Sequence, residues 1–292
     1  MPAREIKIEE DVVFGSGGGR DLCADVYTPE GLDGPAPAAL MLHGGGWQRG
    51  DRKRLRERSL ALAAHGYICV ASEYRLRDEA RWPAHIHDVK AAIRWLHASA
   101  AELNIDETKI AAVGFSAGAH LALLAAGTPG RAEFAGEGGN AGASDELAAT
   151  AVFYAPVRFQ MPGTKVSGGS PVEALAGDDA TEEEAIAAAP IEYVNSDFPP
   201  TLLLSGTFDK MVPVSASLRM YEALAAAGVT TDLRFYGGLP HVFDLLPGHL
   251  ELTMNDVALF LDRVMVRPEF YAEAIANPPL RRAPAASTAG GD

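Results

Sequence analysis

The chain has 292 residues, 48% hydrophobic and 22% charged, which is an ordinary composition for a globular protein. Its formal net charge of −14 disfavours contact with phosphate backbones and anionic lipid heads, so we expect neither a nucleic-acid partner nor a membrane partner. The one cationic run, Arg49 to Arg58, is interrupted by Asp51 and Glu57, and we interpret it as a solvated helix start.

The sequence shows neither a targeting signal nor a disulfide framework. The N-terminus has no apolar core of signal-peptide length, and no stretch approaches the roughly 18 apolar residues of a membrane span, so we expect a cytoplasmic protein. Cys23 and Cys69 lie in apolar, strand-like runs. Two cysteines make no disulfide framework for a chain of this size, so we expect buried free thiols.

Short apolar runs alternate with longer helical patterns along the chain. Strands are predicted at 7–14, 22–28, 39–42, 68–74, 110–114, 149–154, 201–205 and 232–236. Helices are predicted at 54–65, 84–103, 117–126, 214–227 and 250–264. The first two strands, joined by a glycine-rich turn at 15–19, are candidates for an antiparallel hairpin. The alternation predicts an α/β fold with a mostly parallel central sheet of about eight strands and helices on both faces.

We expect one domain over residues 1–277. Two irregular segments, near 127–144 and 158–190, are rich in glycine, with proline and acidic residues in the second. They are candidates for pocket walls, since specificity tends to lie on loops of a rigid scaffold. The tail at 278–292, rich in Pro, Ala, Ser and Gly, is expected to be disordered.

The sharpest motif is Gly114-Phe115-Ser116-Ala117-Gly118, a Gly-x-Ser-x-Gly pattern between a predicted strand and a predicted helix. In that context the serine is lifted clear of the sheet on a strained turn, where it can act as a nucleophile. Ala117 can then offer a backbone N–H to a developing oxyanion. The plainer alternative is a serine that caps a helix, and the strand before it argues against that.

A second motif, His43-Gly44-Gly45-Gly46-Trp47, directly follows a predicted strand. Consecutive glycines let the backbone approach a ligand and turn its N–H groups inward. A plain glycine turn and a phosphate-binding loop are the alternatives, but no Gly-Lys-Ser/Thr follows. The two motifs together are much more specific than either alone.

A serine nucleophile needs a base, and the base needs an orienting acid. Among the eight histidines, His241 and His249 remain once helical and loop histidines are set aside, and His241 is favoured because it follows a strand and a Gly-Gly turn. Asp209 follows the strand at 201–205, so it emerges at the same sheet edge as Ser116, while the rivals Asp178 and Asp179 lie in an irregular segment. The order Ser, Asp, His is that of α/β-hydrolases.

Two further histidines suggest a metal site only weakly. His85, His87 and Asp88 resemble a ligand set, but residues two apart on a helix point in different directions. We therefore predict no metal site. His120, one helical turn after Ser116, is expected to pack inside its helix.

With these motifs in order, the sequence resembles the bacterial esterase/lipase branch of the α/β-hydrolases related to hormone-sensitive lipase. The closer likeness is to its acetyl-xylan-esterase-like and feruloyl-esterase-like subgroup. Besides the two glycine motifs, the matching pieces are Glu73-Tyr74-Arg75-Leu76, Pro83-Ala84 with the helix after it, the segment from Pro199 to Asp209 with Val212-Pro213-Val214, and Pro240-His241-Val242-Phe243. They span about residues 20 to 265.

The resemblance implies Ser116, Asp209 and His241 as the catalytic triad. It also implies an oxyanion hole made by the backbone N–H groups of Gly45, Gly46 and Ala117, with no metal or organic cofactor. The sequence departs from the commoner family pattern at Phe115, where the lipase-like branch usually has Asp, and at Val242 after the histidine. These departures bear on the substrate, and with Trp47 they are the candidate substrate-binding residues.

The expected function is hydrolysis of a small-molecule carboxylic ester, with a short acyl chain, through an acyl-enzyme intermediate. An arylformamidase or amidase on the same triad is one alternative. A non-catalytic small-molecule receptor on a hydrolase fold is another, although all three triad members can be placed. A homodimer is left open, with the helical, aromatic segment at 268–276 as the docking element.

Overall fold

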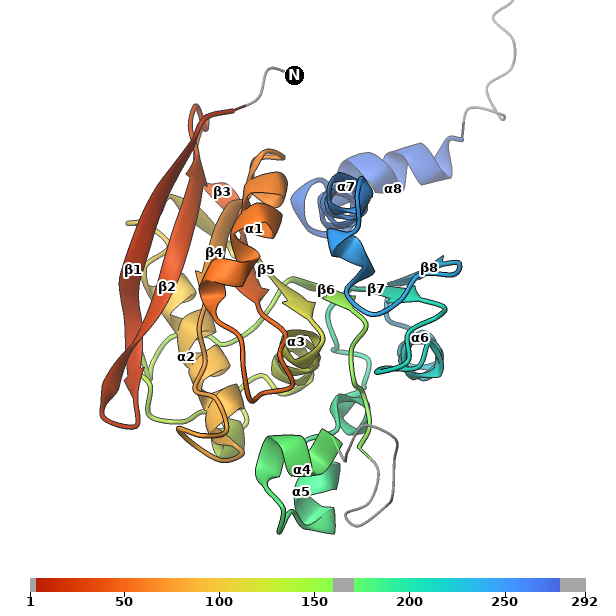
Figure 1. Cartoon of the computed structure of the whole chain (residues 1–292). Coiled ribbons are helices and arrows are strands. Elements are labelled where there is room, and N and C mark those ends of the chain that lie inside the picture. The colour runs from red at the N-terminus through yellow and green to blue at the C-terminus, as the bar shows by residue number, and fades with distance from the viewer. Residues whose placement is uncertain (1–3, 160–170, 279–292) are drawn as a thin grey trace, which may run out of the picture.

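The computed structural model describes residues 4–159 and 171–278. Eight strands in these ranges form one sheet in the order β1-β2-β4-β3-β5-β6-β7-β8 (Figure 1). They are β1 Ile6–Gly17, β2 Arg20–Pro29, β3 Ala36–Leu42, β4 Ile68–Ser72, β5 Ile105–Phe115, β6 Ala149–Phe153, β7 Thr201–Gly206 and β8 Thr231–Tyr236. The strands from β4 to β8 in this order are parallel, and the β1–β2 hairpin is antiparallel. The predicted mostly parallel sheet of about eight strands is confirmed.

Helices cover both faces of the sheet (Figure 1). On one face lie α1 Arg56–Ala63 and α7 His249–Leu261, and on the other lie α2 Ala84–Ala98, α3 Ala117–Gly127 and α6 Ser215–Ala226. Alternation along β3 serves both layers, because Leu40 and Leu42 join the core under α2 and α3 while Met41 joins the core under α1 and α7. Two short helices, α4 Pro171–Ala176 and α5 Glu182–Ala187, lie together at one end of the sheet.

The helix α3, which follows Ser116, is buried along its whole length. A helix with no polar face must be covered on all sides. Here β5 and β6 lie beneath it, while α2 and the segment Pro190–Tyr193 cover the rest. The carboxyl end of β5, which leads into Ser116, is therefore followed by a helix that lies inside the core.

Some element bounds differ from those predicted. The helix α2 ends at Ala98 rather than at 103, because Asn104 adopts a left-handed backbone (φ 56°) and Ile105 N–H bonds back to the Ala100 carbonyl. This turn lets β5 begin at Ile105, earlier than predicted. In the opening hairpin, β1 continues to Gly17, and the turn is confined to Gly18 and Gly19.

The final helix, α8 Pro268–Ala276, follows α7 and a π-helical turn at Asp262–Val266. It projects from the body of the molecule (Figure 1) and has no buried residue. A homodimer through this helix stays a prediction. The disorder expected of the tail concerns residues 279–292, which lie outside the described residues. No helix within 4–159 and 171–278 is long and apolar enough to cross a membrane.

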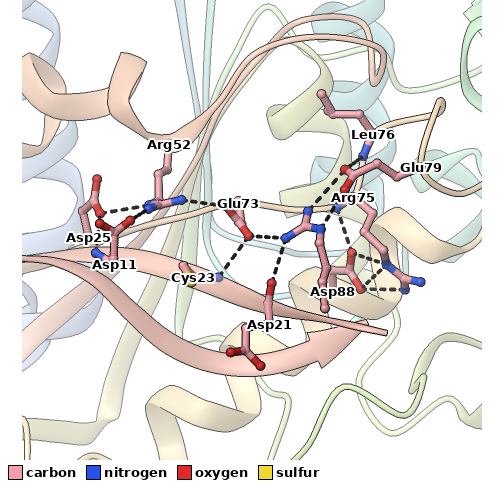
Figure 2. Close-up of polar contacts among 11 residues, drawn as sticks. Asp11, Asp21, Cys23, Asp25, Arg52, Glu73, Arg75, Leu76, Glu79 and Asp88 are labelled. Atoms are coloured by element: carbon pink, nitrogen blue, oxygen red, sulfur yellow. Dashed lines mark hydrogen bonds and ion pairs between the residues drawn. The ribbon is translucent and has the colours of Figure 1, made fainter. Parts of the chain in front are cut away.

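A partly buried ionic network fastens the opening hairpin to the rest of the sheet (Figure 2). Arg52, in the 3-10 helix Arg52–Leu55 that leads into α1, donates to Asp25 at 2.9 Å, to Glu73 at 2.6 Å and to Asp11. Glu73 follows β4 and also accepts from Arg20 at 2.5 Å. One guanidinium thus joins β1, β2 and β4 to the chain that follows the glycine loop.

We expect Arg52→Met to lower the free energy of unfolding by about 3 kcal/mol, because it leaves the buried carboxylate of Asp25 without its cation. The matched control is Arg56→Met, since Arg56 pairs with Glu10 and both side chains are about half exposed. That control should cost less than about 1 kcal/mol. Urea denaturation of both variants measures the difference, and equal losses would contradict this account of the network.

Candidate active site

The turn between β5 and α3 places Ser116 in a strained backbone conformation, with φ 54° and ψ −115°. Close packing against neighbouring backbone requires glycine at both Gly114 and Gly118. A Cβ on Gly114 would lie 2.4 Å from the Gly118 carbonyl oxygen, and a Cβ on Gly118 would lie 2.3 Å from the Leu42 carbonyl oxygen at the end of β3. No side chain fits at either position, so the serine is held close to the chain that follows β3.

Ser116, His241 and Asp209 are brought together from three loops at the carboxyl ends of the parallel strands. The Oγ of Ser116 lies 3.0 Å from Nε2 of His241, and Nδ1 of His241 lies 2.6 Å from Oδ2 of Asp209. The other oxygen of Asp209 accepts the N–H groups of Met211 and Val212 at 2.8 and 2.9 Å. The carboxylate is thereby fixed on both oxygens, and it orients the imidazole toward the serine.

The rival residues lie elsewhere. Nδ1 of His249, at the start of α7, is 3.1 Å from the Pro247 carbonyl oxygen. Asp178 pairs with Arg77 and Asp179 pairs with Arg81, and both carboxylates are largely exposed.

The glycine loop after β3 turns toward Ser116. Gly45 and Gly46 have φ of 133° and 63°, and both line the two cavities that open at Ser116. Within the described chain their backbone N–H groups donate no hydrogen bond. Ala117 is the first residue of α3, so its N–H lies among the helix N-terminal donors that have no intrahelical acceptor. These groups suit an oxyanion beside Ser116.

Two buried histidines support this loop. His43 stacks on Tyr74 with ring centroids 4.3 Å apart, and the Tyr74 hydroxyl donates to the His43 carbonyl at 2.8 Å. Burial lowers the pKa of His43, so the ring is neutral at pH 7. The indole N–H of Trp47 donates to Nδ1 of His120 at 3.2 Å, which leaves Nε2–H of His120 to donate to the Ala188 carbonyl at 2.7 Å.

His120 was expected only to pack, but it connects the glycine loop to the segment after α5. Burial lowers the pKa of His120 to about 4, so it stays neutral and keeps this pair of hydrogen bonds at neutral pH. The sequence gives no signal of this role beyond its spacing from Ser116, because both partners are distant in the chain.

Two cavities open beside Ser116, and the glycine loop contributes to both. The His241-side cavity, of about 660 Å³, is lined by His241, Phe115, Tyr154 and Val242. The Trp47-side cavity, of about 520 Å³, is lined by Trp47, Ala117 and residues of α4. The candidate binding residues therefore divide, with Trp47 in one cavity and Phe115 and Val242 in the other.

Only one of the two irregular segments lines a cavity beside Ser116. The part of the second segment that contains α4 lines the Trp47-side cavity, whereas its residues 160–170 lie outside the described residues. The segment at 127–144 lines neither cavity beside Ser116. Its Ala135 and Gly139 carbonyls accept from Arg94, which holds it against α2.

Two of the three residues in the weak metal pattern, His87 and Asp88, have other partners. Asp88 forms a bidentate pair with Arg75, and His87 Nε2 lies 3.1 Å from the Glu133 carbonyl oxygen. Within residues 4–159 and 171–278, no group of three or more His, Cys, Asp or Glu side chains is arranged to hold a metal ion. Both cysteines are free thiols, with Cys69 buried and Cys23 half-buried.

A buried ionic network beneath His241 was not predicted. Asp244 is fully buried and accepts from the Tyr154 hydroxyl at 2.5 Å and from Nε of Arg58 at 2.7 Å. The Tyr154 ring lies 4.4 Å from the His241 ring, and the Arg58 guanidinium lies 4.2 Å over the Phe115 ring. The Arg58–Asp244 ion pair thus connects helix α1 to the histidine loop and lies beside Phe115, the residue before Ser116.

The sheet topology and the strained Ser116 turn between β5 and α3 define an α/β-hydrolase fold. The chain belongs to the BD-FAE family, whose model matches residues 24–224. This match confirms the resemblance to the esterase/lipase branch related to hormone-sensitive lipase.

Curated relatives include "Esterase LipC" of Mycobacterium tuberculosis, 33% identical over 82% of this chain and 62% of the relative. The "Probable carboxylic ester hydrolase LipM" of the same organism is 31% identical over 83% of this chain and 58% of the relative. The chain spans about three fifths of the length of these relatives.

Among solved structures, Thermogutta terrifontis esterase 2 matches with a TM-score of 0.73 and 27% identity over 92% of this chain and 96% of the other. A truncated carbohydrate esterase from gut microbiota matches with a TM-score of 0.80 and 23% identity over 90% and 98%, a likeness of fold.

We expect Asp244→Asn to lower both stability and turnover. The Arg58 guanidinium would stay buried without its counter-ion, at a cost of about 3 kcal/mol. The histidine loop would also lose its anchor, so kcat should fall more than KM changes. The matched control is Asp179→Asn, because Asp179 pairs with Arg81 at the exposed surface, and this change should leave the stability nearly unchanged. Urea denaturation and steady-state kinetics at 15 °C measure both effects, and full stability in Asp244→Asn would overturn this account.

Proposed function

We propose that the chain is a carboxylic ester hydrolase that acts through Ser116, His241 and Asp209. The observation that carries the proposal is the continuous hydrogen-bonded line from the Ser116 hydroxyl through the His241 imidazole to the buried Asp209 carboxylate. Relatives named esterase and carboxylic ester hydrolase support the reaction class.

The mechanism follows from the positions of these groups. His241 takes the proton of Ser116 as the hydroxyl attacks the ester carbonyl. The N–H groups of Gly45, Gly46 and Ala117 stabilise the oxyanion. His241 then protonates the leaving alcohol, and an acyl-Ser116 intermediate remains. A water molecule, activated by His241, releases the acid and restores the serine.

We further propose a short acyl chain. The two cavities are moderate in size, about 520 and 660 Å³. Charged side chains form part of the lining of both cavities, which is unfavourable for a long apolar chain. Structures of the esterase from Thermogutta terrifontis are described as bound to propionate and to butyrate, which supports small acyl groups in this fold.

A p-nitrophenyl ester series from acetyl to long-chain acyl tests the proposal. We expect the highest kcat/KM for the short esters, and we expect Ser116→Ala to lower kcat by at least about 10³-fold, because the acyl-enzyme cannot form. Ser196→Ala, which changes an exposed serine outside the site, should leave the rates unchanged.

The outcomes separate the alternatives. A preference for long acyl chains would contradict the short-chain proposal alone. Turnover that survives in Ser116→Ala would contradict the triad. Hydrolysis of N-formyl arylamines faster than that of every ester would favour an arylformamidase on the same residues.

A further inference from the structure

The cationic run from Arg49 to Arg58 does not behave as a uniformly solvated helix start. Arg52, Arg56 and Arg58 each form ion pairs with carboxylates. Arg49 and Arg54 form none with any residue that the structure describes, and their side chains make no hydrogen bond there. The run therefore contains three cations that the described protein leaves without an ion pair, namely these two arginines and Lys53.

Both of these arginines line the His241-side cavity together with Ser116 and His241. Arg49 also lines the Trp47-side cavity, where Lys210 is a third cation without a side-chain partner among the described residues. Cations elsewhere in the described chain are mostly ion-paired, down to exposed ones such as Arg158 with Glu192. Unpaired cations thus gather at the mouth of the catalytic site.

This placement runs against the overall charge of the molecule. A net charge of −14 repels anions from most of the surface. A concave site lined by uncompensated guanidinium groups has the opposite local potential, because the low-dielectric walls focus their field. Guanidinium groups also match a carboxylate in geometry, since each can donate two parallel N–H bonds to it.

We propose that the ester substrate carries a carboxylate near its scissile bond, and that Arg49 and Arg54 bind this carboxylate. The inference rests on the proposed esterase function and names its substrate class. A half-ester of a dicarboxylic acid and an ester of a hydroxylated acid both meet the requirement. The far wall of the Trp47-side cavity carries Glu173 and Asp178, which disfavours ligands with several negative charges.

Two matched substrate pairs test the proposal. Mono-p-nitrophenyl adipate and p-nitrophenyl hexanoate differ by a carboxylate on the acid side. The pair 4-acetoxybenzoate and 4-acetoxybenzamide differs on the alcohol side. The quantity measured is the ratio of kcat/KM for the anionic ester to that for the neutral one, in the wild type, Arg49→Gln, Arg54→Gln and Lys53→Gln.

Comparing this ratio between variants cancels the intrinsic reactivity of the substrates. It also cancels any general effect of the cations on the oxyanion. Lys53 is the control, because it belongs to the same cationic run and is exposed but lines neither cavity.

In at least one pair, we expect each arginine variant to lower the ratio by roughly tenfold, with Lys53→Gln unchanged. The wild-type preference should also weaken as salt is raised from 0.05 to 0.5 M. Ratios that stay the same in all variants for both pairs would overturn the carboxylate proposal and leave the esterase function intact. Failure to hydrolyse either the neutral or the charged esters would instead count against the esterase function itself.

Discussion

The site depends on one close approach, between the start of α3 and the end of β3. Gly118 lies so near the Leu42 carbonyl that even a methyl group could not be added. This contact brings the turn that carries Ser116 against the chain that becomes the glycine loop. Because β3 and β5 are parallel neighbours with Leu42 opposite Gly114, Ser116 and the proposed oxyanion donors emerge side by side. The remaining parts of the site are added around this pair.

Ion pairs then fix the loops that the sheet alone would leave mobile. Arg52 secures the chain after the glycine loop to the opening hairpin, and Arg58 secures α1 to the histidine loop through Asp244. Each of these two buried guanidinium groups is matched by a carboxylate, which offsets the cost of burying its charge. The arginines between and before them, Arg54 and Arg49, are the ones that face the cavities unpaired. One short run thus supplies both ion-paired structural cations and unpaired cations that line the cavities.

Much of this arrangement could be predicted from the sequence. The Ser116 turn, the glycine loop, and the aspartate and histidine after their strands follow local rules, because the carboxyl ends of parallel strands lie at one edge of the sheet. The Asp244 network could not be predicted, since Arg58 and Tyr154 are 186 and 90 residues away and no pattern links them. The end of α2 was missed because the apolar spacing continues past Ala98, while a left-handed residue at Asn104 turns the chain. The cationic run is a helix start with mostly exposed cations, as predicted, but the burial of Arg52 and Arg58 was not predicted because it depends on carboxylates distant in the chain.

The central claim is that Ser116 is a nucleophile activated by His241. It is tested most directly by reaction with a fluorophosphonate, followed by mass spectrometry of the digested protein. The account predicts one adduct per chain, located on the peptide that contains Ser116. The adduct should be lost when the protein is unfolded before labelling, and it should form far more slowly in His241→Asn. An adduct on another serine, or equal labelling of the folded and unfolded chain, would contradict it.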